Sequence, residues 1–405
     1  MDVFPPEVAL LILSQVPQRT LVALCSLSKA LRGVAEAALY RSASVGAEGL
    51  KGWCSAIIGS EKGKEARVLT IALPNGQIPA SNAARLQSAL ERCGNLRQLH
   101  VLQAGDYLIT VKDDPQLWPL LTALSCRLTH FTVVAPFTSH NIAVAAVRFF
   151  ATQNLTAISL PNCSVKHPPD LSCLPSVVSL SITAKAFEAV QPAVKGWKLQ
   201  NVQLYMTFND VQRLRFLAQH VATLTSLSLV RDPGSAVPTA DMMTAIAKWV
   251  PGIERLCITE TGTSQPRRDE PSLHHIMSRF PSLRKLVLQF HRTQITFFED
   301  PDPPARAEPT RRSARNAPAP APPPAPLKLT RPGDRRKLGD ALMAAFPQLD
   351  RLELGADVFV GAVGLEKTWV TAVWARFPSG AGPGRVEWSE VAGRVWDAQT
   401  SFSGY

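Results

Sequence analysis

The 405-residue chain lacks the signatures of a secreted or membrane-embedded protein. Its seven cysteines are scattered singly, without a C-x-x-C pair, which is typical of reduced thiols that fill small core positions. The first basic residue, Arg19, follows the first apolar run instead of preceding it, so a secretory signal is not predicted. That run is uninterrupted only from Val8 to Leu13, whereas a membrane-spanning helix needs about 20 residues. We therefore expect a cytoplasmic or nuclear protein, or one found in both places, with no membrane partner.

The chain also lacks a long run of like charge. Its net charge is +11, but residues 299–337 hold nine basic and five acidic side chains, a surplus of only four. The other seven positive charges (11 − 4) are spread widely. This is a weak electrostatic footprint for nucleic-acid binding, so we do not expect nucleic acid as a partner.

No catalytic or ligand-binding motif is complete. GSEKGKE (59–65) is one residue short of a phosphate loop and has Glu65 where a Ser or Thr must meet magnesium. GAGPG (380–384) follows an expected helix and precedes a short strand, which is the wrong order for a dinucleotide fingerprint. No His, Cys and carboxylate set stands at metal-ligand spacing. The sequence predicts a non-catalytic protein without metal, cofactor or small-molecule substrate.

What the chain does contain is a six-residue pattern, apolar-x-x-apolar-x-apolar, repeated ten times. Each copy predicts a short strand whose fourth and sixth residues face the core. Apolar residues at helical spacing and a Pro or Gly turn precede most copies, so the repeated unit is helix, turn and strand, with parallel pairing of successive strands. The copies are VLTIAL (68–73), LRQLHV (96–101), LTHFTV (128–133), LTAISL (155–160), VVSLSI (177–182), LQNVQL (199–204), LTSLSL (224–229), IERLCI (253–258), LRKLVL (283–288) and LDRLEL (349–354).

This unit resembles the leucine-rich repeat, whose period is about 20–29 residues. The LxxLxL core carries the resemblance over residues 66–355, although the Asn or Cys that the family places beyond the strand is matched only by Cys163. The resemblance implies an α/β solenoid with parallel strands on its concave face and helices on its convex face. A doubly wound α/β fold is the alternative that the strands leave open.

The last repeat interval is lengthened by a segment rich in proline. Residues 299–337 hold eleven of the chain's 33 prolines and almost no bulky apolar side chains, which predicts a disordered, basic insertion. After it we expect the last repeat and a Trp-rich C-terminal cap, in which Trp369, Val370, Val373, Trp374 and Phe377 form one face of a helix.

The first 45 residues predict three short helices with more apolar positions than so short a chain can enclose. Val8, Leu11, Ile12 and Val16 fall at helical spacing before Pro17, and Leu21, Leu24 and Leu31 continue the pattern. Some of this apolar surface should therefore be buried against a partner.

The stretch FPPEVALLILSQVPQRTLVALCSLSKALRGVAEAALYRS resembles the F-box, the module of roughly 40 residues that binds the Skp adaptor of cullin–RING ubiquitin ligases. The sequence departs from the family where Phe4 replaces Leu and where Leu31 stands in place of Trp. The adaptor-binding set that the resemblance implies is Phe4, Pro5, Glu7, Val8, Leu11, Ile12, Leu13, Val16, Pro17, Leu21, Leu24 and Leu31.

An F-box followed by leucine-rich repeats is the layout of a ligase substrate receptor, which binds the Skp adaptor, through it a cullin, and a client protein. In the alternative, the N-terminal helices only cap the solenoid of a scaffold or receptor. The organisation expected is an F-box-like module at 1–45, a repeat solenoid at 46–298, the insertion at 299–337, and the last repeat with its cap at 338–405.

The outward strand positions are small and polar early in the chain, whereas the last three repeats bring a row of cations. Two interpretations stay open: a solvated charged edge, or a surface for an acidic or phosphorylated client segment. The candidate client-binding residues are His100, His130, Asn201, Gln203, Arg255, Lys285 and Arg351.

Overall fold

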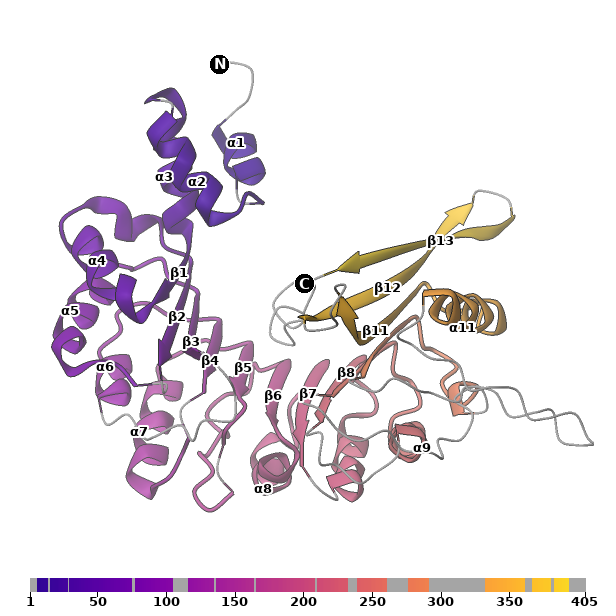
Figure 1. Cartoon of the computed structure of the whole chain (residues 1–405). Coiled ribbons are helices and arrows are strands. Elements are labelled where there is room, and N and C mark those ends of the chain that lie inside the picture. The colour runs from indigo at the N-terminus through magenta and orange to yellow at the C-terminus, as the bar shows by residue number, and fades with distance from the viewer. Residues whose placement is uncertain are drawn as a thin grey trace, which may run out of the picture. The chain divides into compact units, whose positions relative to one another are not determined.

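The computed structural model describes residues 6–13, 15–27, 29–74, 77–104, 116–134, 136–163, 165–207, 210–231, 239–260, 276–290, 332–360, 366–379 and 382–392 (Figure 1). The chain forms two compact units, Met1–Leu199 and Gln200–Tyr405. Each unit is α/β, and most of its strands pair in parallel with the next strand along the chain. The α/β class expected from the sequence is therefore confirmed.

Three helices open the first unit, as the apolar spacing predicts, although the first ends at Leu13 and leaves Val16, expected in that helix, in the turn that follows. They are α1 (Pro6–Leu13), α2 (Gln18–Leu27) and α3 (Lys29–Arg41). Proline is well suited to a first helical position because its missing N–H would have no partner there, and α1 begins at Pro6. Pro17 lies between α1 and α2, where the chain turns.

Helices alternate with strands along the rest of the first unit, and polar caps define where several of them begin. The Ser139 hydroxyl accepts the backbone N–H of Ile142, and the Thr183 hydroxyl accepts that of Ala186. In Figure 1 these helices lie on one side of the strands. They are α4 (Ala47–Ile58), the 3-10 segment η1 (Glu61–Glu65), α5 (Ala80–Glu91), α6 (Leu117–Thr122), α7 (His140–Ala151) and α8 (Ala184–Val194).

The strands of the first unit are neighbours in chain order, and the pairs from β1 to β6 are parallel. Five of them start two or fewer residues into a predicted six-residue pattern, and β1 was not predicted because SASVG lacks that pattern. The strands are β1 (Ser42–Gly46), β2 (Val68–Pro74), β3 (Gln98–Ala104), β4 (His130–Val133), β5 (Ala157–Leu160) and β6 (Ser179–Thr183).

The register of β2 corrects the frame of the first repeat. Val68 pairs with Gln98 and Thr70 with His100, so ARVLTI (66–71), not VLTIAL, is equivalent to LRQLHV. Ala66 is buried where the later repeats have Leu, Val or Ile. The two frames overlap because apolar residues continue at alternate positions through Leu73, and an alternating pattern does not fix its own start.

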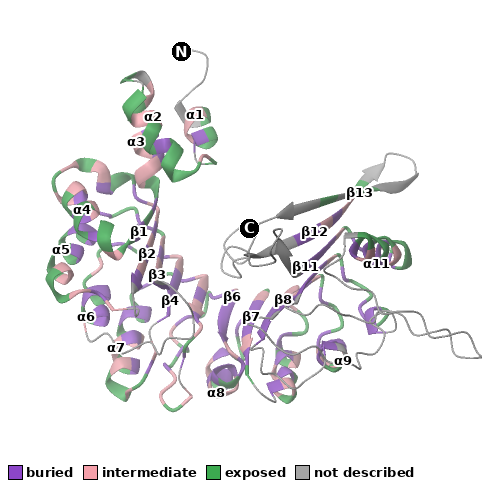
Figure 2. Cartoon of the chain, in the orientation of Figure 1, coloured by how far each residue is buried: buried purple, intermediate pink, exposed green. Residues whose placement is uncertain are grey.

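The predicted inward positions form the core of both units (Figure 2). Leu99 and Val101 of β3, and Leu227 and Leu229 of the second unit, are typical, each at most 3% exposed. In the first unit the ring of Trp118 packs among Phe131, Phe137, Phe149 and Phe150, with centroids 5.5–6.3 Å from its own. These rings bring strand β4 and helices α6 and α7 together.

The second unit repeats the parallel arrangement through five strands. They are β7 (Asn201–Met206), β8 (Ser226–Arg231), β9 (Arg255–Glu260), β10 (Lys285–Phe290) and β11 (Arg351–Val360). Its described helical elements are η2 (Asp210–His220), α9 (Thr239–Trp249) and α11 (Pro332–Ala345). The η2 segment is a 3-10 helix in which Leu214 and Leu217, three residues apart, are both buried.

The insertion predicted at 299–337 falls between β10 and β11. These strands pair directly, with Lys285 opposite Arg351, so the segment between them adds no strand among the described residues. Residues 299–331 lie outside the described residues, and α11 begins at Pro332, inside the predicted range.

The helix predicted around Trp369 is wrong. Residues 366–379 form strand β12 (Glu366–Ser379), which pairs antiparallel with β11 and with β13 (Gly382–Ala392). Val373 and Phe377 are four residues apart, a spacing that puts two side chains on one face of a helix or of a strand, and β-branched and aromatic residues favour the strand. The strand predicted at VEW (386–388) is confirmed as part of β13.

None of the helices in the described residues is long and apolar enough to cross a bilayer.

Candidate interaction surfaces

The three N-terminal helices share a small apolar core. Leu13 of α1, Leu21 of α2, and Ala35 and Ala38 of α3 are buried together, each at most 8% exposed. The half-buried residues that pack against this cluster are Leu10, Val16, Leu24, Cys25, Val34 and Leu39. The core is small because α1 and α2 are only 8 and 10 residues long, so much of their apolar surface stays outside it.

Exposed large apolar side chains concentrate on α1 and α2. Leu11 is 67% exposed, Ile12 51% and Leu27 80%. Val8 and Val22 are also exposed, so these two helices hold five of the nine large apolar side chains found exposed in the described residues. We call these five residues the apolar helix surface. Grouped exposed apolar side chains are a feature that protein interfaces share.

The predicted adaptor-binding set divides into three groups. Val8, Leu11 and Ile12 belong to the apolar helix surface, and Pro17 is also exposed. Leu13 and Leu21 belong to the core, with Val16 and Leu24 packed against it, and Leu31 is half-buried. Phe4 and Pro5 lie outside the described residues, and Glu7 is in α1 with a side chain that is not described.

Sequence reasoning missed Val22 and Leu27, two members of the apolar helix surface. The signal for them was present, since apolar residues fall on more than one face of the helix over residues 18–27. In α2 one apolar face, with Leu21, is buried in the small core, and the other, with Val22 and Leu27, stays exposed.

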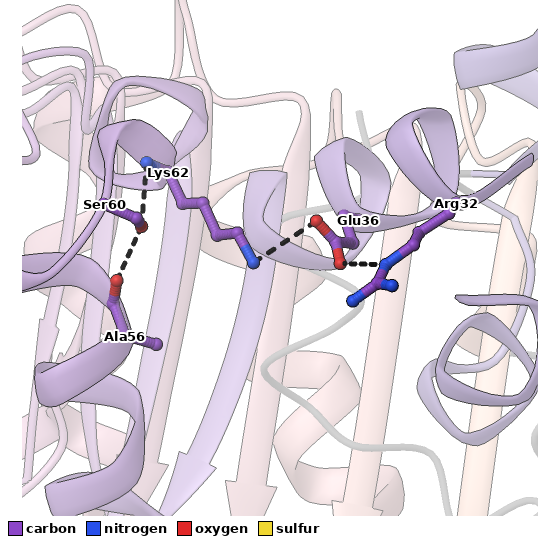
Figure 3. Close-up of polar contacts among 5 residues, drawn as sticks. All are labelled: Arg32, Glu36, Ala56, Ser60 and Lys62. Atoms are coloured by element: carbon purple, nitrogen blue, oxygen red, sulfur yellow. Dashed lines mark hydrogen bonds and ion pairs between the residues drawn. The ribbon is translucent and has the colours of Figure 1, made fainter. Parts of the chain in front are cut away.

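An ion-pair bridge fastens α3 to the repeats that follow (Figure 3). The Lys62 ammonium of η1 lies 3.2 Å from the Glu36 carboxylate, and Arg32 donates to the same carboxylate at 3.1 Å. The Lys62 backbone N–H donates to the Ser60 hydroxyl, which in turn donates to the Ala56 carbonyl at the end of α4.

This bridge also sets the charge state of its carboxylate. Hydrogen bonds from Arg32 and then Lys62 hold the pKa of Glu36 below its ordinary value of 4.5, because both stabilise the charged form. The Lys62 ammonium also stands 4.8 Å above the Tyr40 ring, a cation–π contact that orders the C-terminal turn of α3.

A row of polar residues crosses the five parallel strands of the second unit. Strand register aligns one residue from each strand on the face opposite the buried leucines: Asn201, Ser226, Arg255, Lys285 and Arg351. Neighbouring strands lie about 4.8 Å apart, so the three cations are adjacent. The Arg255 guanidinium donates to the Asn201 side-chain oxygen at 3.2 Å. The structure therefore brings four of the candidate client-binding residues into one row.

Glu353 supplies a carboxylate to this row. It stands two residues beyond Arg351, on the same face of β11, and its side chain is 1% exposed. Arg351 donates to Glu353 Oε1 at 2.6 Å, and the Lys285 ammonium lies 3.6 Å from the same oxygen. Three cations and one carboxylate leave a formal charge of +2. Glu353 was not among the candidate residues predicted from the sequence, although its carboxylate neutralises part of the row.

Next to this row, the Cys257 thiol lies among polar groups. Burial raises the pKa of Cys257, and the Glu353 carboxylate raises it further, whereas hydrogen bonds with Thr259 and Ser228 lower it. Gln203 is aligned with Ser228 and Cys257 and is itself 1% exposed. Val287 continues this second row toward Glu353, and Gln203, Ser228 and Glu353 are shielded from solvent, unlike the Arg351 side chain, which is 42% exposed.

The two candidate histidines lie in the first unit, on adjacent strands. His100 Nδ1 is 2.9 Å from the Thr132 hydroxyl, and His130 Nδ1 is 2.9 Å from that of Thr129. Burial lowers the pKa of His130, which keeps its imidazole neutral near physiological pH. Both are half-buried and so present a limited polar surface.

Metal-binding geometry does not occur in the described residues, where no group of three or more His, Cys, Asp or Glu side chains could hold an ion. In the comparisons with known proteins, no protein-family model matches the chain. No curated protein sequence matches it significantly.

Proposed function

We propose that the protein is the substrate-recognition subunit of a Skp–cullin–F-box type ubiquitin ligase. Helices α1 to α3 would form an F-box-like module that binds the Skp adaptor, and the helix–strand repeats would form a leucine-rich repeat solenoid that binds a client. The single observation that carries this proposal is the apolar helix surface, with Leu11, Ile12 and Leu27 each more than half exposed.

An adaptor interface accounts for this exposure in energetic terms. Burying a leucine or isoleucine side chain stabilises a complex by about 1.5–3 kcal/mol, because its apolar area leaves water. The core of this module is small, with Leu13, Leu21, Ala35 and Ala38 as its buried residues. Leucines that lie outside this core add little to the stability of the folded module. Binding to an apolar partner gives those side chains a function that folding does not.

The polar strand row of the second unit is the proposed client site. Its formal charge of +2 favours an acidic client segment, and Arg351 is exposed enough to be reached. Arg255 adds a further cation to the row and donates to the neutral Asn201 side chain at 3.2 Å. The histidines of the first unit are less suited, since they are half-buried and one is held neutral.

The proposed protein works by proximity and not by chemistry of its own. Holding a client beside a charged conjugating enzyme turns a bimolecular encounter into an effectively intramolecular one, which raises the local concentration of client lysines. For this, the bridge between α3 and η1 matters, because it fixes the adaptor-binding helices relative to the repeats of the same unit.

A scaffold or receptor without a ligase link is the second candidate, and one observation favours it. The Glu36–Lys62 pair and the contact of Lys62 with Tyr40 tie α3 to the start of the repeats, as a solenoid cap would be tied. A cap does not, however, need apolar side chains on the far side of α1 and α2.

Binding of the purified full chain to the Skp adaptor, measured by calorimetry, tests the proposal. Leu11→Asp with Ile12→Asp places two charges on the apolar helix surface and should weaken binding more than 30-fold, as expected when hot spots worth at least about 2 kcal/mol are lost. Val144→Asp with Val221→Asp is the matched control, because both valines are exposed elsewhere and should leave binding unchanged. An adaptor that does not bind the wild-type chain would refute the ligase assignment and favour the scaffold.

A further inference from the structure

Four arginines mark the edge at which the first strands begin. Arg41, Arg67 and Arg97 each stand one residue before a strand, β1, β2 and β3, and Arg127 comes three residues before β4. Arg41, Arg97 and Arg127 are exposed and Arg67 is half-buried. We call these four residues the arginine edge. It is separate from the apolar helix surface and from the polar strand row.

Main-chain hydrogen bonds bring these residues side by side. The Arg67 N–H donates to the Arg41 carbonyl at 3.0 Å, and the Arg97 N–H donates to the Arg67 carbonyl at 2.8 Å. The Arg97 guanidinium reaches the Arg127 carbonyl at 3.5 Å. Because adjacent parallel strands are about 4.8 Å apart, the backbones of Arg41, Arg67 and Arg97 stand in line, and Arg127 lies two residues before the next aligned position, Thr129.

The charges on this edge are not neutralised internally. Two lysines nearby already have partners, since Lys62 pairs with Glu36 and Lys64 with Glu61. In the described parts of the chain, no carboxylate oxygen lies within 4.0 Å of any of the four guanidinium groups. The Arg67 guanidinium instead donates to the carbonyl oxygens of Lys64 and Ala66.

Carboxylates in the neighbouring turns reduce the positive electrostatic potential of the arginine edge without cancelling it. Glu65 and Glu91 are exposed there, and Glu91 accepts a hydrogen bond from Gln87 at 3.3 Å. Four arginines against these two carboxylates leave a surplus of two positive charges along the edge. A row of like charges repels itself, so a ligand of opposite charge is stabilised by all its members together.

We propose that the arginine edge binds an acidic segment of the protein that docks on α1 and α2. This inference rests on the proposed function, because the edge starts at Arg41, the last residue of α3, at the strand ends nearest to the helices that carry the apolar surface (Figure 1). Arginine matches carboxylate in a two-point geometry, so a line of guanidinium groups recognises a run of Asp and Glu.

A protein segment fits this edge better than a nucleic acid does. Binding of single-stranded nucleic acid depends on aromatic rings on which bases stack. Tyr40, the aromatic residue next to Arg41, is half-buried beneath the Lys62 ammonium and does not present its face for stacking. The edge offers guanidinium groups without an exposed aromatic ring beside Arg41, which suits the carboxylates of a protein segment.

Fluorescence anisotropy of the full chain with a labelled decaglutamate peptide tests the arginine edge directly. Arg97→Glu with Arg127→Glu should weaken peptide binding at least 10-fold. Arg148→Glu with Lys185→Glu changes the net charge equally at exposed positions of α7 and α8, and should retain most of the affinity. Circular dichroism melting curves of both variants exclude unfolding as the cause of any difference.

These measurements distinguish an acidic protein segment from a nucleic acid as the ligand of the arginine edge. The ligase proposal is tested separately. Equal loss in both variants, or in neither, would overturn the inference. Tighter binding of an oligothymidylate of equal charge, lost in Arg97→Glu with Arg127→Glu, would overturn it in favour of nucleic acid. The Leu11→Asp, Ile12→Asp variant should bind decaglutamate like wild type. If the wild-type chain binds the Skp adaptor, the arginine variant should slow that association and reduce its salt dependence; if no adaptor binds, the peptide result still stands.

Discussion

The indole nitrogen of Trp374 donates to the Asp340 carboxylate at 3.0 Å, joining strand β12 to helix α11. The Trp374 ring is fully buried and lies against Gly339, where a Cβ atom would collide with its six-membered ring. Arg376, two residues along β12, donates to the carbonyl oxygens of Met343 and Leu349. The antiparallel strands are therefore fastened to the last helix by hydrogen bonds as well as by packing.

Gly339→Ala should destabilise the protein by about 1–3 kcal/mol, because the new methyl group must displace the Trp374 ring. Gly333→Ala is the control in the same helix, since nothing lies within 4 Å of its added Cβ. It should be neutral or stabilise by up to about 1 kcal/mol through helix propensity. Urea denaturation measures both, and equal effects would contradict the close packing.

Glu36→Gln should lower stability near neutral pH by about 0.2–1 kcal/mol, the range of partly exposed ion pairs. The Glu36 pKa is lowered in the folded protein, so its contribution is present above the ordinary value of 4.5 and is lost as pH falls through the folded value. Wild type and variant should therefore converge in acid. Unfolding free energies measured across this pH range test the prediction, and a difference that grows in acid would refute it.

Lys285→Met alone should cost less than about 1 kcal/mol, because Arg351 still neutralises Glu353 at 2.6 Å. Lys285→Met with Arg351→Met leaves a buried carboxylate without a described cation partner and should cost about 3–5 kcal/mol. Adding Glu353→Gln should recover much of that loss. Denaturant unfolding of both single variants and the double variant tests this. If the losses of unfolding free energy in Lys285→Met and Arg351→Met add up to the loss in the double variant, the two cations do not share this carboxylate.

Arg255→Glu should abolish client capture without changing adaptor binding. The Glu353 carboxylate is paired with Lys285 and Arg351, so reversing the charge of Arg255 leaves both of those pairs in place. Quantitative mass spectrometry of proteins that co-purify with wild type and variant measures capture. Arg279→Glu, at an exposed position in the same unit, is the matched control.

Native thiol labelling should divide the cysteines by burial. Cys25 and Cys173 are half-buried and should react with a disulfide reagent first. Burial raises the pKa of Cys54 to about 11 and of Cys93 and Cys163 to about 12, so these thiols stay protonated and should react only on unfolding. Fast labelling of Cys93 in the folded protein would contradict the packing around it.

The strands were predictable because their side chains alternate in period two and each copy repeats the same spacing. Leu180 and Ile182, like Leu286 and Leu288, point to the core as predicted. The early start of the first repeat was not predictable, since Ala66 is too small to register as the apolar position that it fills. Strand β1 was not predicted for a similar reason, because one of its two buried residues, Ala43 and Val45, is an alanine.

The interaction surfaces were less predictable than the fold. Apolar spacing identified α1 and α2. It could not distinguish Leu13, which is buried, from Ile12, which is exposed, because the burial of each side chain depends on how the helices pack. The outward positions of the last repeats were identified correctly, whereas the pairing of Glu353 with Lys285 and Arg351 depends on strand register. Partners and client stay predictions.

The change of strand direction at β12 limits how the array can vary in length. Each parallel strand from β7 to β11 offers the next one the same ladder of donors and acceptors, so a duplicated or deleted repeat would still find a matching edge. The β11–β12 pairing is antiparallel and has a different spacing. Gene duplication can therefore lengthen this protein between existing repeats, while the hairpin keeps its place as a fixed end piece.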